Sequence, residues 1–265
     1  MVIKAAISNI AWSKECDEDI FEILRKEEFQ AIEIAPTRII SEKPYEHLQE
    51  AKEFAQSLKT KYGLDICSIQ SIWYGRNENM FNSKEEREIL YEHTKKAILF
   101  SETVNAGNLV FGCPKNRCIK KESDYNVAVE FFKKLGDYAL KHNTVLAIEA
   151  NPIIYNTNFI NTTMQAIEFI KDIDSDGIKL NLDMGTIIAN QENFEVDSDN
   201  IKIINHVHLS EPFLKKIKKR QISQKIISQL LKNNYMGYIS IEMGLVQDKN
   251  DIIESIDILK SMIYK

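Results

Sequence analysis

The chain has 265 residues, which suits one large domain or two small ones, and its 44% hydrophobic content is enough for a sizeable core. Its 39 acidic residues outnumber its 34 basic residues, and the resulting net charge of -5 argues against a protein whose main function is to bind DNA or RNA. The N-terminus shows no signal-peptide pattern and no apolar run reaches about 18 residues, so we expect a cytoplasmic protein that does not enter a membrane.

Short apolar runs alternate with segments of helical periodicity along the whole chain. Eight runs are predicted as strands: 2–9, 30–35, 64–72, 108–113, 144–150, 178–183, 203–209 and 238–243. Seven segments are predicted as helices: 15–27, 44–61, 83–104, 122–141, 162–173, 220–233 and 249–262. The polar stretch between the sixth and seventh strands has the weakest helical pattern. Eight such units predict an α/β fold, a closed (β/α)₈ barrel that occupies residues 1–265 as a single domain.

The glycines agree with this division, because eight of the nine bracket predicted strands. Four come just before a strand, where the end of a helix favours a residue in the left-handed conformation: Gly63, Gly107, Gly177 and Gly237. Four come just after one, where the backbone turns close to a bound group: Gly75, Gly112, Gly185 and Gly244. Gly136 alone falls inside a predicted helix.

Four side chains with acidic or imidazole groups stand at the ends of the last four predicted strands: Glu149, Asp183, His208 and Glu242. In a (β/α)₈ barrel these strand ends meet on one face, where the chemistry of such barrels takes place. One such acid could be an ordinary helix cap, but four on successive strands favour a single divalent metal site. Three carboxylates and one imidazole suit Mn²⁺, Mg²⁺ or Co²⁺, and Zn²⁺ is also compatible.

Alternation along the strands adds residues that would lie beneath these ligands. His206 shares a face with His208, and we expect it to orient the ligands or to be a buried histidine rather than a ligand itself. Glu33, on the second strand, is either a similar orienting residue or a carboxylate satisfied within the core.

The ends of these strands resemble those of the xylose-isomerase-like sugar isomerases and epimerases. The segments Ile-Glu-Ala-Asn-Pro, Leu-Asp-Met-Gly-Thr, His-Val-His-Leu-Ser-Glu-Pro and Ile-Ser-Ile-Glu-Met carry the resemblance, which extends over nearly the whole chain. Leu-Val-Phe-Gly-Cys-Pro-Lys-Asn-Arg is similar to a branch described as sugar phosphate isomerase/epimerase. The resemblance implies a metal-dependent enzyme in which Glu149 and Glu242 act as acid and base. One removes a proton beside a carbonyl, the metal stabilises the enediolate, and the other returns a proton to the opposite face.

The resemblance fails at three positions that contact the sugar in the ketose 3-epimerases of this superfamily. Their histidine three residues after the aspartate is Thr186 here, their glutamate six after the first glutamate is Tyr155, and their arginine six after the histidine is Leu214. A free ketohexose is therefore not implied as the substrate.

Other residues after the predicted strands are candidates for substrate binding. Lys115 and Arg117 could hold a phosphate or carboxylate, although a solvated loop is an equal alternative for them. Asn151, Tyr155 and, more weakly, Gln70 could bind hydroxyl groups; these three and the aromatic Trp73 follow or end strands. Trp73 could stack on a sugar or simply pack beneath a loop. We therefore expect a small carbohydrate as the partner, with an anionic one among the options, and a homo-oligomer is compatible with the sequence.

Three other functions remain open at this point. A dehydratase or lyase would begin with the same abstraction of a proton. An abasic-site endonuclease shares the superfamily fold but needs three zinc ions and more histidines than the five of this chain. A sugar-binding barrel that retains the metal site would bind metal without turning over a substrate.

Overall fold

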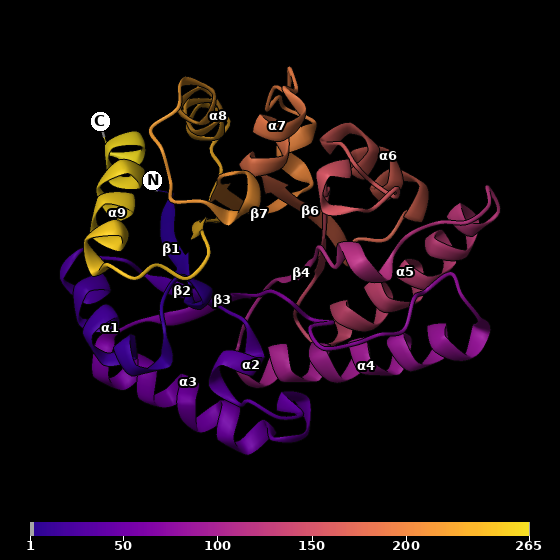
Figure 1. Ribbon diagram of the computed structural model, residues 1–265, viewed down its shortest axis with the longest axis horizontal. Coiled ribbons are helices and arrows are strands. Elements are labelled where there is room, and N and C mark those ends of the chain that lie inside the picture. The colour runs from indigo at the N-terminus through magenta and orange to yellow at the C-terminus, as the bar shows by residue number, and fades with distance from the viewer. Residues whose placement is uncertain (1–2, 265) are drawn as a thin grey trace.

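The protein, described over residues 3–264 by a computed structural model, forms one closed barrel of eight parallel strands in the order β1 to β8. This arrangement confirms the predicted (β/α)₈ fold. The helices surround the strands as a ring (Figure 1). Residues 1, 2 and 265 lie outside the described residues. All three belong to the predicted domain, and residue 2 belongs to the predicted first strand.

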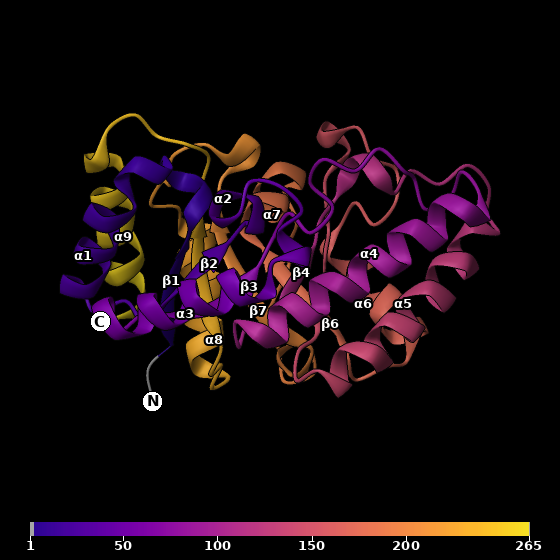
Figure 2. The same ribbon diagram turned by 90° about the horizontal axis from the view of Figure 1, so that it is seen from below.

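Each strand of the barrel lies within one predicted apolar run, except that β7 extends one residue beyond its run to Ser210. The strands are β1 Lys4–Ser8, β2 Ala31–Ile34, β3 Asp65–Ile69, β4 Leu109–Phe111, β5 Leu146–Glu149, β6 Ile178–Asp183, β7 Ile204–Ser210 and β8 Tyr238–Glu242. Pairing of β8 with β1 closes the sheet. In Figure 2 the strands run upward from the N-terminus, so the loops that follow them lie at the top of that view.

The helices follow the predicted order, with two additions. They are α1 Asp17–Lys26, α2 Pro36–Ile39, α3 Leu48–Tyr62, α4 Lys84–Thr103, α5 Asp124–Lys141, α6 Thr163–Ile173, α7 Met184–Asn190, α8 Gln221–Lys232 and α9 Lys249–Ile263. The short α2 was not predicted. The weak pattern between β6 and β7 corresponds to α7, which starts directly after the strand because the Asp183 side chain caps its first turn.

Most apolar side chains pack between the outside of the barrel and the surrounding helices, where they form one continuous core. The inside of the barrel differs. Its apolar part is a small cluster of Ala6, Ala31 and Cys67, against which Tyr238 packs. Strand-end residues further along β2, β7 and β8 carry polar side chains that are equally buried, among them Glu33, His208 and Ser240. The barrel interior thus has an apolar floor beneath a polar upper layer.

The expected left-handed glycines before strands are confirmed only at Gly63, whose φ of 73° ends α3. After α4, α6 and α8 the left-handed residue is Asn105, Asp174 or Asn234 instead. Short Asn and Asp side chains tolerate this backbone conformation, so no glycine is needed there.

Gly177 and Gly136 are explained by a contact between a loop and a helix. A Cβ atom on Gly177 would lie 2.0 Å from the backbone oxygen of Gly136 in α5. The two glycines therefore allow the backbone before β6 to approach α5 closely, and this contact accounts for the glycine in the middle of a helix.

Candidate active site

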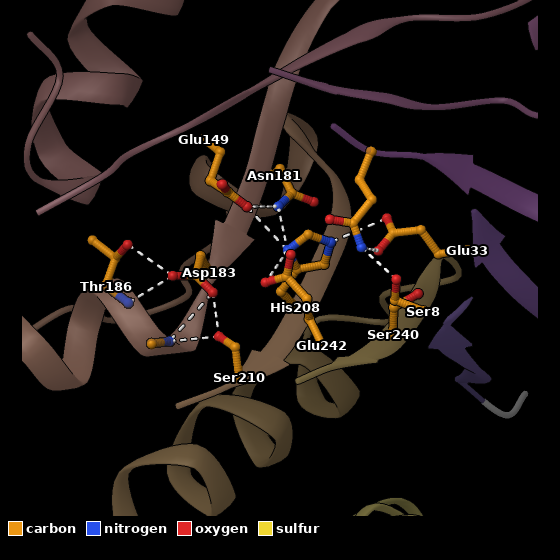
Figure 3. Close-up of polar contacts among 12 residues, drawn as sticks. Ser8, Glu33, Glu149, Asn181, Asp183, Thr186, His208, Ser210, Ser240 and Glu242 are labelled. Atoms are coloured by element: carbon orange, nitrogen blue, oxygen red, sulfur yellow. Dashed lines mark hydrogen bonds and ion pairs between the residues drawn. The ribbon is translucent and has the colours of Figure 1, made fainter. Parts of the chain in front are cut away.

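The carboxyl ends of β5 to β8 bring together the four residues that the sequence predicted as metal ligands. Asp183 on β6 pairs with His208 on β7, and Ser210 on β7 pairs with Glu242 on β8, so the register places these residues near one level. One side-chain ligand atom from each of Glu149, Asp183, His208 and Glu242 lies within 4.8 Å of the others. The Nδ1 atom of His208 is 3.0 Å from Glu149 Oε1 and 3.2 Å from Glu242 Oε2 (Figure 3).

The electrostatics of this cluster call for a positive charge at its centre. Burial raises the pKa of Glu242 to about 7, and burial together with the charge of Glu149 raises the pKa of Asp183. Burial would lower the pKa of His208, but the carboxylates of Glu242 and Glu33 outweigh it and raise this pKa well above its usual value. A proton on His208 thus compensates the carboxylates, and a divalent cation would compensate them better. The donor set of three carboxylates and one imidazole fits such a cation.

Glu33 holds the opposite side of the His208 ring. Its Oε2 atom is 3.1 Å from His208 Nε2 and 3.4 Å from His206 Nε2. A shift in the pairing of β2 and β3 falls directly before Glu33, and such irregularities redirect side chains. Burial would raise the pKa of this carboxyl, but the charge and hydrogen bond of His208, together with His206 and Ser68, outweigh burial and lower the pKa to about 2. The ionised Glu33 accepts a hydrogen bond from the Nε2–H of His208. This bond orients the ring so that Nδ1 faces the cluster.

His206 lies away from the cluster and contacts Ser240, whose Oγ is 2.9 Å from His206 Nε2. Burial lowers the pKa of His206 to about 4, so it is neutral at physiological pH. Gln70 completes this lower network, because its amide donates to Glu33 Oε1 over 3.2 Å and also contacts Ser8.

Asp183 is held by its own helix and by a residue that sequence reasoning missed. The backbone N–H and the hydroxyl of Thr186 donate to Asp183 Oδ2 over 2.7 and 2.8 Å. Ser210 donates to Asp183 Oδ1. Ser210 follows His208 by two residues on β7, so the alternation that selected His206 and His208 would have identified it had the predicted strand not ended one residue early.

Glu149 is oriented by two amides. Asn181 donates to Glu149 Oε1 over 2.7 Å, and Asn151 donates to Oε2 over 3.2 Å. Gly112 lines the same space, and a Cβ atom there would lie 2.7 Å from Glu149 Oε2. The absence of a side chain at Gly112 therefore leaves room for this carboxylate.

A cavity of about 240 Å³ is lined by three of the four predicted ligands, whereas His208 is completely buried. Among the predicted substrate-binding residues, Gln70, Asn151 and Tyr155 line it together with Glu149, Asp183 and Glu242. Residues not predicted also line it, and the largest of these are Glu211 and Leu214, which follow β7.

The predicted role of Trp73 is corrected by its surroundings. Trp73 is buried in the core, donates from Nε1 to Thr94 Oγ1 over 2.8 Å, and packs edge-on against Phe111 with ring centroids 4.9 Å apart. It does not line the cavity. The indole is therefore a packing residue beneath the loop, the alternative that the sequence left open.

The predicted anion-binding pair is also corrected. Lys115 is away from the cavity and donates to Asn77 Oδ1 over 2.9 Å. Arg117 is completely buried, with Nη1 donating to the backbone oxygen of Glu149 over 2.9 Å and Nη2 to that of Ile160 over 3.3 Å. Its guanidinium also lies over the ring of Phe111. Arg117 therefore holds the loop after β5 and does not face a substrate.

Two of the cations on the loop after β7, Lys216 and Arg220, are paired with carboxylates. Arg220 binds Glu211 with both Nε and Nη2, at distances of 2.7 to 2.9 Å. Lys216 pairs with Asp251 and Glu254. The described residues that line the cavity include no lysine and no arginine.

Comparisons with known proteins agree with the geometry. The profile of the xylose isomerase-like TIM barrel family matches residues 21–262. A search of curated proteins finds no match. Solved structures with the same fold include a 3-keto-D-glucoside 4-epimerase from E. coli, at 18% identity, TM-score 0.75 and 98% coverage of both chains.

Two further structures are similar. D-psicose 3-epimerase from Clostridium cellulolyticum H10, solved with D-tagatose, has 15% identity, TM-score 0.80 and 99% coverage of both chains. A sugar phosphate isomerase/epimerase from Parabacteroides distasonis has 15% identity and TM-score 0.69, with 100% of this chain and 95% of that chain covered. Within residues 3–264 no helix is long and apolar enough to cross a membrane.

Proposed function

Because the chain belongs to the family of xylose isomerase-like TIM barrels, we propose that it is a divalent-cation-dependent isomerase or epimerase of a small carbohydrate. The observation that carries the proposal is the convergence of Glu149, Asp183, His208 and Glu242, three of which line a cavity of about 240 Å³. The sugar epimerases among the similar structures support the same class of reaction.

The two glutamates provide the chemistry of proton transfer. Glu149 and Glu242 both approach His208 Nδ1 and both line the cavity, so a substrate lying over the cluster contacts both carboxylates. We propose that one of them removes the proton from the carbon beside a carbonyl and that the other returns a proton to the opposite face. A bound divalent cation supplies the Lewis acidity that stabilises the oxyanion developed in this step.

The polar side chains in the lining suit hydroxyl groups. The side-chain oxygen of Asn151 is buried and accepts no hydrogen bond from the described residues, so it offers an acceptor to a hydroxyl in the cavity. The space of 240 Å³ equals the volume of about eight water molecules at roughly 30 Å³ each. Because no cationic side chain lines it, we propose an uncharged sugar as the reacting group rather than a sugar phosphate or sugar acid.

Exchange of substrate hydrogen with D₂O tests the proposal. Uncharged ketoses and keto-sugars incubated with the Mn²⁺-loaded protein should gain deuterium at one carbon beside the carbonyl, observed by NMR. Glu149→Gln and Glu242→Gln should each reduce exchange by roughly 10²-fold or more, since each removes a proton-transfer group.

Glu195→Gln is the control, because Glu195 is exposed and pairs with Lys225 away from the cavity. Its exchange rate should equal that of the unaltered protein. Exchange that persists in both cavity variants would exclude the two-glutamate mechanism.

A further inference from the structure

Four exposed apolar side chains lie on two turns, each of which contributes one residue to the lining of the cavity. Ile153 and Ile154, on the 3₁₀ turn Ile153–Tyr155 after β5, are 72% and 44% exposed. Phe213 and Leu214, on the turn Pro212–Leu214 after β7, are 58% and 38% exposed. We call these four residues the rim patch. Exposed clusters of large apolar side chains on a protein surface commonly mark binding sites.

The rim patch is continuous with the cavity. Tyr155, which lines the cavity, joins the two turns because its hydroxyl accepts a hydrogen bond from the Phe213 N–H over 2.8 Å. The rings of Tyr155 and Phe213 also pack with centroids 5.7 Å apart. Leu214 belongs to both surfaces, since it lines the cavity and is partly exposed outside it. A ligand in the cavity could therefore extend onto the patch without a break.

The backbone keeps Phe213 and Leu214 in this position against its own preference. Their φ angles are 61° and 51°, in the left-handed region that disfavours residues with a Cβ atom. The N–H of Leu214 donates to the Glu211 oxygen over 3.0 Å, and the Leu214 oxygen accepts from the Gly244 N–H over 2.7 Å. Strained residues fixed by several hydrogen bonds are concentrated at functional sites. Here the result is two large apolar side chains displayed at the mouth of the cavity.

We propose that the rim patch binds an apolar group attached to the sugar, so that the ligand is a glycoside with an alkyl or aryl aglycone. The placement of the sugar end of this ligand in the cavity rests on the proposed function. A sugar unit lying over the carboxylates would occupy the cavity of about 240 Å³, and an apolar substituent of that unit would extend to its mouth, where the rim patch begins. Since a glycoside has no free anomeric carbonyl, the carbonyl of a reacting substrate would be a ketone elsewhere on the ring.

The test compares two ligands that differ only in the aglycone. Methyl β-D-glucoside and phenyl β-D-glucoside are titrated calorimetrically into the Mn²⁺-loaded full-length protein. A phenyl group that buries roughly 60 Å² of apolar surface should bind about tenfold more tightly than a methyl group. Phe213→Ser and Leu214→Ser should each reduce this preference, and the double variant should abolish it. Leu140→Ser is the control, because Leu140 is similarly exposed at 45% but lies on α5.

Equal affinity for the two glucosides, or a preference that survives the double variant, would overturn the proposal. So would a dimer that Phe213→Ser converts to a monomer in analytical ultracentrifugation, because the patch would then be a subunit interface. The outcome is separable from that of the deuterium experiment. A phenyl preference without any exchange would leave the rim site standing and remove the proposed reaction, whereas exchange without a phenyl preference would do the reverse.

Discussion

Arg117 and Glu242 show how surroundings decide what a charged residue can do. Arg117 follows β4 and Glu242 ends β8, both on the active face of the barrel, and both were candidates for contact with a substrate. The Arg117 guanidinium is enclosed beneath the loop after β5, where backbone oxygens of Glu149 and Ile160 accept its protons. Glu242 points into the cavity beside His208. The position of Glu242 at the end of β8 was enough to predict its role from the sequence, whereas the burial of Arg117 depends on the path of the loop after β5.

The enclosure of Arg117 leads to a prediction about stability and specificity. Arg117→Met should destabilise the protein by about 2–5 kcal/mol, since it leaves buried carbonyl oxygens without a donor. It should change affinity for uncharged and phosphorylated sugars by the same factor. Urea unfolding and competition for binding measure the two effects, and Lys115→Met, at an exposed position, should stay within about 0.5 kcal/mol. A selective loss of affinity for phosphorylated sugars would instead show that Arg117 binds an anion.

The raised pKa values predict that cation binding depends on pH. In the cation-free protein the pKa of Glu242 is about 7 and that of His208 is well above its usual value, so a cation must displace protons from both. Affinity for Mn²⁺ should therefore rise from pH 6 to pH 8, about tenfold per pH unit for each proton released. Calorimetry in two buffers of different ionisation enthalpy counts these protons. An affinity independent of pH over this range would contradict the prediction.

The raised pKa of Glu242 also affects the folding stability of the cation-free protein, but this contribution decreases as the pH rises, whereas cation affinity increases. Its folded-state pKa of about 7 lies above the ordinary value of 4.5, so the folded state holds this proton more tightly than the unfolded state. The resulting stabilisation is complete below pH 4.5 and is lost as the pH rises through about 7. Cation binding replaces it at higher pH.

At the scale of elements, the strands and the long helices were predictable because each has a regular pattern of apolar residues in the sequence. Strands of a parallel barrel are buried on both faces, and they appear as short apolar runs. Contacts between elements produce no such pattern in the sequence. Gly136 and Gly177 are 41 residues apart in number (177 − 136), and only the structure shows that the backbone before β6 touches α5 at this point.

This contact predicts different outcomes for two glycines that both precede strands. Gly177→Ala should destabilise the protein by about 3 kcal/mol or more, because the added Cβ would meet the Gly136 backbone oxygen at 2.0 Å. Gly107→Ala is the matched control, since nothing lies within 4 Å of a Cβ there, and its effect should stay within about 0.5 kcal/mol. Urea unfolding curves measure both. Similar stabilities for the two variants would argue against the close approach.

At the scale of the whole molecule, closure of the barrel creates the site. Glu33 on β2 and His208 on β7 are 175 residues apart in sequence, yet they form one buried pair across the barrel interior. The four candidate ligands likewise come from four different strands. A cation held by all four should therefore stabilise the entire fold and not a single loop.

Thermal unfolding checks this expectation. Mn²⁺ at about 100 times its Kd should stabilise the folded state by about 2.7 kcal/mol and raise Tm by roughly 5–10 °C. Asp183→Asn should greatly reduce the shift. Asp176→Asn, at a highly exposed aspartate that pairs with Lys179, should keep the full shift. An unchanged Tm in the unaltered protein would contradict a cation site formed by these four residues.

The sequence by itself determined the class of fold, the order of its elements and the four residues that meet at the strand ends. It could do so because apolar periodicity and residue type are local properties, and parallel strands in a barrel must end on the same face. The tertiary structure decided which nearby polar residues face the cavity. It placed Arg117 and Trp73 in the packing, brought Ser210 to Asp183, and set the apolar rim patch beside the cavity. These outcomes depend on how loops from different strands pack together, and the sequence of any one loop does not contain that information.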